Sequence, residues 1–117
     1  FYCPGSILKV EGIDSSHPIT YGYGSESIVY FHRCAVFEIT GEGPVGLAWY
    51  PDDPDEIILS GWIIDEEGLT AGAPVLIEYP MEDGKVIMAA FLANNRAQPH
   101  ETFKFIFNAI FDAAVSE

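Results

Sequence analysis

A polar run at residues 94–101 holds the side chains whose types could bind or react, namely Arg96, Gln98, His100 and Glu101. The run separates an apolar stretch from a phenylalanine-rich amphipathic segment, so it marks a strand-to-helix junction. In open α/β sheets, ligands bind at the carboxyl ends of strands, where such junctions lie. Arg96, Gln98 and His100 are therefore candidate ligand-binding residues. The residues alone favour the alternative, in which the run hydrogen-bonds neighbouring loops and seats the helix.

Three histidines are present, His17, His32 and His100, and their spacing bears on whether the chain holds a metal. A catalytic zinc site needs about three convergent ligands, of which two are usually close in sequence. None of the segments around these histidines has the HxxE or HExxH spacing that brings two ligands together. We therefore expect no catalytic residue, no cofactor and no metal ion in this chain.

Cys3 and Cys34 are the only cysteines, and neither lies in the strand-turn-helix context that exposes a nucleophilic thiolate. Their spacing matches no metal or redox motif, so the sequence leaves open whether they form a disulfide. The segment YGYGSES (21–27) lacks a third glycine at the spacing of a phosphate-binding loop. No nucleophile and base are paired in the sequence.

Two further clusters suggest binding rather than catalysis. The acidic segment 52–56 could supply oxygen ligands to calcium, but it lacks the spacing of a calcium loop and Pro54 interrupts it. Trp49, Tyr50 and Trp62 could form a platform for a sugar, although aromatic residues in strands usually belong to the core. A carbohydrate- or peptide-binding module therefore stays open as an alternative.

The composition limits the classes of partner. Five lysines and arginines stand against 18 acidic residues, which gives a formal charge of −13. Such a charge repels phosphate backbones and anionic membranes, so we expect no nucleic acid and no membrane partner. No apolar run reaches the length of about 18 residues that spans a bilayer. The 117 residues suit one domain, 1–117, and because the chain opens on Phe1 in mid-pattern we expect it to be part of a longer polypeptide.

Most of the chain has the alternating or β-branched patterns of short strands, broken by Gly-, Pro- and Asp-rich turns. Ile7 and Lys9 alternate with Leu8 and Val10, which predicts a half-buried strand. The predicted strands cover residues 6–12, 27–40, 45–51 and 57–64. The segment 27–40 is long enough for two strands or for one bent strand. The predicted connections are 12–27, 41–44, 51–56 and 65–73.

A hairpin is the clearest local signal. Residues 74–80 and 85–93 flank Asp83-Gly84, a pair that favours a tight turn with Gly84 at positive φ. Residues 85–93 are almost wholly apolar. We therefore expect that strand to be central in its sheet and covered on both faces.

The last element has the spacing of an amphipathic helix. Pro99 suits its first position, Gln98 its N-cap and Glu101 its first turn. The apolar stripe, centred on Phe107, is expected to be buried against 85–93. The predicted fold is α+β or α/β, a strand-rich mixed sheet with a C-terminal helix packed on it. The stripe consists of Phe103, Ile106, Phe107, Ile110, Phe111 and Ala114.

Short motifs in the last part of the chain resemble a known family. They are Ser60-Gly61-Trp62, Gly84-Lys85, the series Arg96, Gln98, His100, and Thr102-Phe103-Lys104, with SSHPITYGY (15–23) upstream. Together they resemble the C-terminal domain that follows the catalytic domain in a bacterial branch of the zinc carboxypeptidase (carboxypeptidase A-like) family. Such tail domains are similar to the second half of class I glutamine amidotransferase-like folds, where a hairpin and a final helix complete an α/β sheet.

The chain departs from this family pattern at Pro99 and Glu101, and its hairpin turn is unusually acidic at Glu82-Asp83. The family's zinc ligands and catalytic glutamate belong to a different domain, so none is carried over to this sequence. The resemblance thus implies a non-catalytic accessory domain whose partner is the parent catalytic domain, with zinc held there. The alternatives are a ligand-binding module built on exposed aromatics and the 94–100 loop, and a free-standing enzyme.

Overall fold

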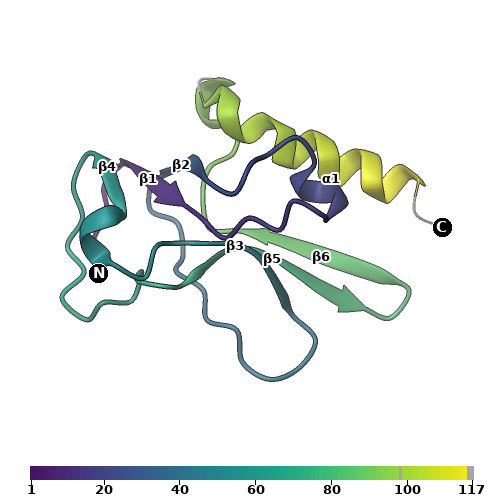
Figure 1. Cartoon of the computed structure of the whole chain (residues 1–117), viewed down its shortest axis with the longest axis horizontal. Helices are drawn as coiled ribbons and strands as arrows, with labels where there is room; N and C mark the ends of the chain where they lie inside the picture. Colours follow the sequence, from purple (N-terminus) through teal and green to yellow (C-terminus); the bar gives the residue numbers. More distant parts are fainter. Residues whose placement is uncertain (98, 116–117) are drawn as a thin grey trace.

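The structure of the chain, a computed structural model, describes residues 1–97 and 99–115. Its elements are strands, short 3-10 turns and one α-helix (Figure 1). The strands are β1 (Ser6–Val10), β2 (Ser27–Phe31), β3 (Val45–Trp49), β4 (Ile58–Ser60), β5 (Pro74–Met81) and β6 (Gly84–Ala89). The helical elements are η1 (Pro18–Thr20), η2 (Pro54–Glu56), η3 (Asn95–Ala97), η4 (His100–Thr102) and α1 (Phe103–Val115).

The strands form two three-stranded antiparallel sheets, in the orders β2-β1-β4 and β3-β5-β6. In β1, Leu8 and Val10 are fully buried while Ile7 and Lys9 lie on the partly exposed face, which confirms the predicted alternation. Reciprocal backbone hydrogen bonds between Glu11 and Trp49 join the two sheets.

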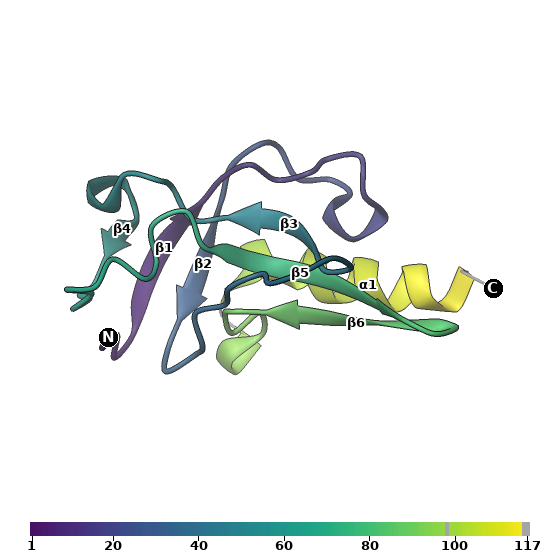
Figure 2. The same ribbon diagram turned by 90° about the horizontal axis from the view of Figure 1, so that it is seen from below.

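A mixed fold with strands dominating and a C-terminal helix is confirmed. Because the strand pairs that the structure describes are antiparallel, the fold is α+β rather than α/β. The helix α1 runs alongside the β5–β6 hairpin, and β4 lies at the opposite end of the molecule from the hairpin turn (Figure 2). No helix in the described part of the chain is long and apolar enough to cross a membrane.

One hydrophobic core is shared by both sheets. Its buried members come from β1, β2, β3 and β5, from the segments between strands, and from α1, which contributes Phe105. Its fully buried side chains include Leu8, Val10, Ile19, Val29, Phe31, Leu47, Tyr50, Val75 and Leu76. Cys3 is buried and Cys34 half-buried, and both are free thiols. The disulfide that the sequence left open is therefore not formed.

The Tyr50 hydroxyl is a polar atom inside this core with no hydrogen-bond partner among the described residues. Burial raises the pKa of the Tyr50 phenol, so the group stays neutral. An unpaired buried hydroxyl loses its bonds to water without replacement. We expect Tyr50→Phe to raise the free energy of unfolding, by up to about 1 kcal/mol, when urea midpoints are compared.

Tyr23 is the matched control, because its hydroxyl donates a hydrogen bond to the backbone carbonyl of Glu101. Tyr23→Phe removes the same atom but leaves that carbonyl unpaired, so we expect it to lower the free energy of unfolding by about 1 kcal/mol. Equal losses in Tyr50→Phe and Tyr23→Phe would contradict the view that the Tyr50 hydroxyl is unpaired.

The expectation that 85–93 forms a central, doubly covered strand is wrong. Among the described residues, β6 pairs with β5 alone, at the edge of its sheet, and Val86 is exposed. The buried residues of this apolar stretch are Ala90 and Phe91, which follow the strand. An edge strand leaves one row of backbone N–H and C=O groups unpaired by the sheet, whatever the hydrophobicity of its side chains.

The predicted hairpin is present, but its turn is displaced by one residue. Met81 pairs with Gly84, so Glu82-Asp83 form the turn. Glu82 has the positive φ, of 49°, that was expected at Gly84. The prediction for Gly84 is therefore wrong, because the strands extend further towards the turn than their apolar runs indicate.

The predicted strand at 27–40 is shorter than expected. Only Ser27–Phe31 pairs, and Arg33 has a φ of 55°, which breaks the extended backbone. Beyond it, Val36 and Phe37 pack irregularly against the core. Their hydrophobicity reflects partial burial without strand pairing.

The predicted orientation of the helix is also wrong. Phe105 is buried, whereas Phe107, the centre of the predicted buried stripe, is exposed together with Ile110 and Phe111. Polar contacts fix this orientation, because the Asn108 amide donates to two backbone carbonyls at the end of η1. Polar side chains thus seat the helix together with the buried Phe105, while Phe107, Ile110 and Phe111 face outward.

A second polar contact attaches α1 to the hairpin. The buried Asp112 carboxylate pairs with Lys85 of β6, which also lies 3.6 Å from Glu78 of β5. The hydrogen bond with Asp112 raises the pKa of the Lys85 ammonium, and Glu78 adds to the effect. Lys85 therefore stays charged and bridges the helix to the sheet.

The start of the helical segment partly follows the prediction. Glu101 lies in the first turn of η4, as expected, but Pro99 occupies the N-cap position and not the first helical position. The proposed N-cap, Gln98, lies outside the described residues.

Candidate functional site

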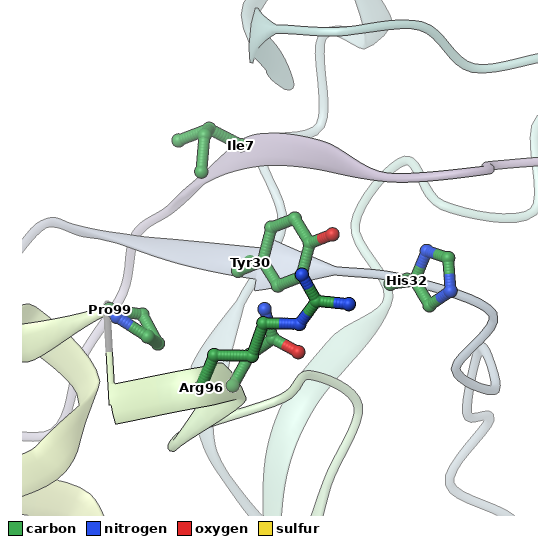
Figure 3. A pocket seen from close by; sticks show the side chains of 6 residues that line it. Ile7, Tyr30, His32, Arg96 and Pro99 are labelled. Carbon is green, nitrogen blue, oxygen red and sulfur yellow. The ribbon is translucent and has the colours of Figure 1, made fainter.

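A hollow of about 450 Å³ lies where β1 and β2 meet the loop after β6 (Figure 3). We call it the Arg96 hollow. It is lined by Ile7, Tyr30, His32, Asn95, Arg96 and Pro99.

Strand pairing positions the floor of the Arg96 hollow. Tyr30 of β2 lies directly opposite Ile7 of β1 in the antiparallel register. His32 directly follows β2, and its ring lies parallel to that of Tyr30, with centroids 6.3 Å apart and planes 4° apart, so both rings lie on the same side. The neighbouring residues Val29 and Phe31 point into the core.

His32 is held in one orientation by a hydrogen bond between its Nδ1 and the backbone carbonyl of Pro4. A carbonyl only accepts, so Nδ1 carries the hydrogen. In the neutral ring, Nε2 is then free to accept a hydrogen bond. The backbone carbonyl of Tyr30 is also fixed, since it accepts from Leu92 N at 2.9 Å and so attaches the loop after β6 to β2.

Arg96 comes from η3, and its guanidinium extends across the hollow towards Tyr30 and His32 (Figure 3). Its backbone has φ 51° and ψ 28°, the left-handed region that glycine and asparagine enter more readily than arginine. Within the described residues, no hydrogen bond or ion pair engages the guanidinium. The side chain is exposed.

The charge of the Arg96 hollow is opposite to that of the chain. None of its lining residues is acidic, although the protein has 18 acidic residues and only five lysines and arginines. The polar groups on its wall are a guanidinium, an amide, a phenol and an imidazole. This set can donate several hydrogen bonds to an anion, but it includes no nucleophile that a base activates.

The structure separates the residues of the predicted junction. Arg96 lines the Arg96 hollow, whereas His100 lines an adjoining hollow of about 260 Å³. The two hollows share Ile7, Tyr30 and Pro99. Arg96 and His100 therefore lie along one surface without converging on one point, and Gln98 lies outside the described residues.

Tyr30 and His32 are site residues that the sequence pattern did not predict. Their spacing of two, at the end of the predicted strand 27–40, was the available signal, since such spacing places both side chains opposite the buried Val29 and Phe31. Ile7 and Asn95 had no comparable signal, because their approach to Tyr30 depends on tertiary packing.

The other histidines have structural contacts. His17 caps η1 by accepting from Ile19 N through Nδ1, so its Nε2 carries the hydrogen and lies 2.6 Å from Glu78 Oε2. His100 lies beside the ring of Phe103, with centroids 5.2 Å apart. In the described part of the chain, no three His, Cys, Asp or Glu side chains are grouped so that they could hold a metal ion.

The remaining candidate clusters do not form sites. In the acidic segment 52–56, Asp53 caps η2 by accepting from Asp55 N at 3.0 Å. Tyr50 is in the core and so cannot stack on a sugar, while Trp62 is exposed against Tyr2 and Trp49 lines a separate hollow. The three aromatics therefore do not make a platform.

Comparison of the chain with protein-family models, with curated proteins and with solved structures finds no match.

Proposed function

We propose that this chain is a non-catalytic accessory domain that docks, through the apolar face of α1, on the catalytic domain of a zinc carboxypeptidase-like protein. The observation that carries the proposal is the exposure of that face. The resemblance of the motifs between Ser60 and Lys104 to the tail domains of that family gives the class of partner.

The apolar face of α1 is continuous along the helix. Phe107, Ile110, Phe111 and Val115 are each at least 60% exposed, and their spacing of three and four places them on one side. At the N-terminal end of the face, Phe107 borders a hollow of about 280 Å³ that is also lined by Asn94, Phe103 and Ile106. The hollow could receive one apolar side chain of a partner.

Exposure of this face is costly for an isolated domain. Burial of a large apolar side chain is worth about 1.5–3 kcal/mol, and the face offers a row of them. Monomeric soluble proteins rarely expose contiguous apolar patches of this kind outside interaction sites. The opposite side of α1, with Phe105 and Asp112, is already occupied by the rest of the domain.

The charge of the chain favours a different partner over a second copy. Each of two copies would carry a formal charge of −13 over the whole chain, and their mutual repulsion would oppose association. A catalytic domain with an apolar patch and a basic rim would instead be attracted. We therefore expect docking that weakens as salt concentration rises.

The test is to produce the chain and the catalytic domain of the same polypeptide separately and to measure their binding by calorimetry. We expect Phe107→Ser to weaken binding by about 30-fold or more, as truncation of an aromatic anchor does in other interfaces. Leu59→Ser on β4 is the control, because Leu59 is similarly exposed but lies at the far end of the molecule. The chain alone should cleave no C-terminal peptide bond.

Three outcomes would overturn the proposal. They are peptidase activity in the isolated chain, an equal effect of Leu59→Ser and Phe107→Ser on docking, and no measurable docking. A dimer of the chain that Phe107→Ser dissociates, seen by sedimentation, would assign the face to a second copy instead.

A further inference from the structure

We propose that the Arg96 hollow binds the carboxylate group of a small organic acid with an apolar body. The site is separate from the docking face, since the hollow is formed by β1, β2 and the loop before η4, whereas the face lies on α1. The inference does not depend on the proposed accessory function.

The donors of the hollow match a carboxylate. A guanidinium presents parallel N–H groups that bond both oxygens of a carboxylate at once. Asn95 and Tyr30 also line the hollow, and the amide and the phenol hydroxyl can each contribute a neutral hydrogen bond. In a chain with a formal charge of −13, the long-range field repels anions, so only such a local cluster can hold one.

The backbone of Arg96 gives independent support. A residue with a side chain held at φ 51° is strained by roughly 1–2 kcal/mol, and such strain gathers at functional sites. Among residues 1–97 and 99–115, none bonds the guanidinium, so none of them offsets this strain with a hydrogen bond. Asparagine or glycine would adopt this conformation more easily, so the backbone conformation does not favour an arginine.

The shape of the surface indicates the rest of the ligand. Ile7, the Tyr30 ring and Pro99 form an apolar strip that continues from the Arg96 hollow into the adjoining one. A flat or branched apolar body attached to the carboxylate would lie on this strip. The adjoining hollow is also lined by Glu101, whose carboxylate accepts from Ser27 Oγ at 3.0 Å. A second carboxylate beside Glu101 would be repelled, which favours monocarboxylic acids.

The experiment is a titration of the whole chain with phenylacetate, followed by NMR of the backbone amides. We expect shifts concentrated at Ile7, Tyr30, His32 and Arg96. Phenylacetamide, which has the same body without the charge, should bind at least about tenfold more weakly, because it loses the charge-assisted pair. Inorganic phosphate should also bind more weakly, since it lacks the apolar body.

Two arginine variants separate binding from folding. Arg96→Asn should weaken phenylacetate binding at least about tenfold while the melting temperature stays equal or rises, because asparagine tolerates the left-handed backbone. Arg33→Asn is the matched control, since Arg33 is also exposed, has a φ of 55° and lies outside the hollow. It removes the same charge and the same strain, and binding should not change.

The proposal fails if Arg96→Asn binds phenylacetate as well as the unaltered chain does. It also fails if Arg33→Asn weakens binding equally, because the effect would then arise from net charge. Equal binding of phenylacetamide or of phosphate would show that the hollow does not select a carboxylate with an apolar body. An absence of shifts at millimolar phenylacetate would overturn the proposal directly.

Discussion

Truncation of Phe105 to alanine is expected to lower the free energy of unfolding by about 3–5 kcal/mol, which is the usual loss for a buried phenylalanine. Phe105 is 4% exposed and stacks on Tyr23, with ring centroids 4.0 Å apart and planes 9° apart. It also contacts Phe91, at 5.5 Å between centroids. A cavity at this point would remove the contacts of α1 with Tyr23 and Phe91. Small domains are stable by only about 5–15 kcal/mol, so the loss would be a large part of the total free energy of unfolding.

The matched control is Phe107→Ala, which removes the same atoms from the same helix two residues further on. Phe107 is 64% exposed, so we expect a change within about 0.5 kcal/mol. Urea midpoints of both variants measure the difference, with far-ultraviolet circular dichroism to check that the helix is retained. A loss at Phe107 as large as that at Phe105 would mean that the helix is rotated relative to this structure.

The orientation of α1 could not be predicted from hydrophobic spacing, and the reason is physical. Spacing identifies which side chains share a face, but it does not say whether the core or another surface covers that face. Here the helix is seated by Phe105 together with Asn108 and Asp112, whose hydrogen bonds and ion pair are satisfied by η1 and β6. These partners are distant in sequence, so the polar residues carried no local signal of burial.

Local sequence patterns were sufficient to predict which side chains are buried where burial alternates along one strand. The prediction for β1 is confirmed because Leu8 and Val10 meet the core while Ile7 and Lys9 do not. The same patterns do not predict the place of β6, because continuous hydrophobicity here belongs to an edge strand and not to a central one. Whether a strand lies at the edge depends on which strands pair with it, and that is a property of the whole sheet.

The Arg96 hollow was predictable only in part. The polar run near Arg96 was identified as a candidate from its residue types, and the alternation in β2 could have added Tyr30 and His32. Their meeting depends on the hydrogen bond from Leu92 N to the Tyr30 carbonyl, between segments more than 60 positions apart. No pattern in either segment specifies that pairing.

Substitution of Gly61 by alanine is expected to lower the free energy of unfolding by about 2–4 kcal/mol, because the backbone there admits no side chain. Gly61 has a φ of 102°, which only glycine adopts without strain. An added Cβ would lie 2.8 Å from Ser6 Cα and 2.9 Å from the carbonyl oxygen of Gly5. The neighbouring strand cannot move away, since Ser6 Oγ donates to Trp62 O and accepts from Trp62 N, both at 2.8 Å.

Gly84→Ala is the control for this prediction, because Gly84 has no positive φ and the nearest atom to an added Cβ is Met81 O at 3.8 Å. Its unfolding free energy should stay within about 0.5 kcal/mol of the unaltered chain. Thermal and urea unfolding of both variants give the comparison. If Gly61→Ala proved as stable as Gly84→Ala, the close approach of β1 to the segment after β4 would be wrong. The pairing of Ile7 with Ser60, which depends on that approach, would then be wrong as well.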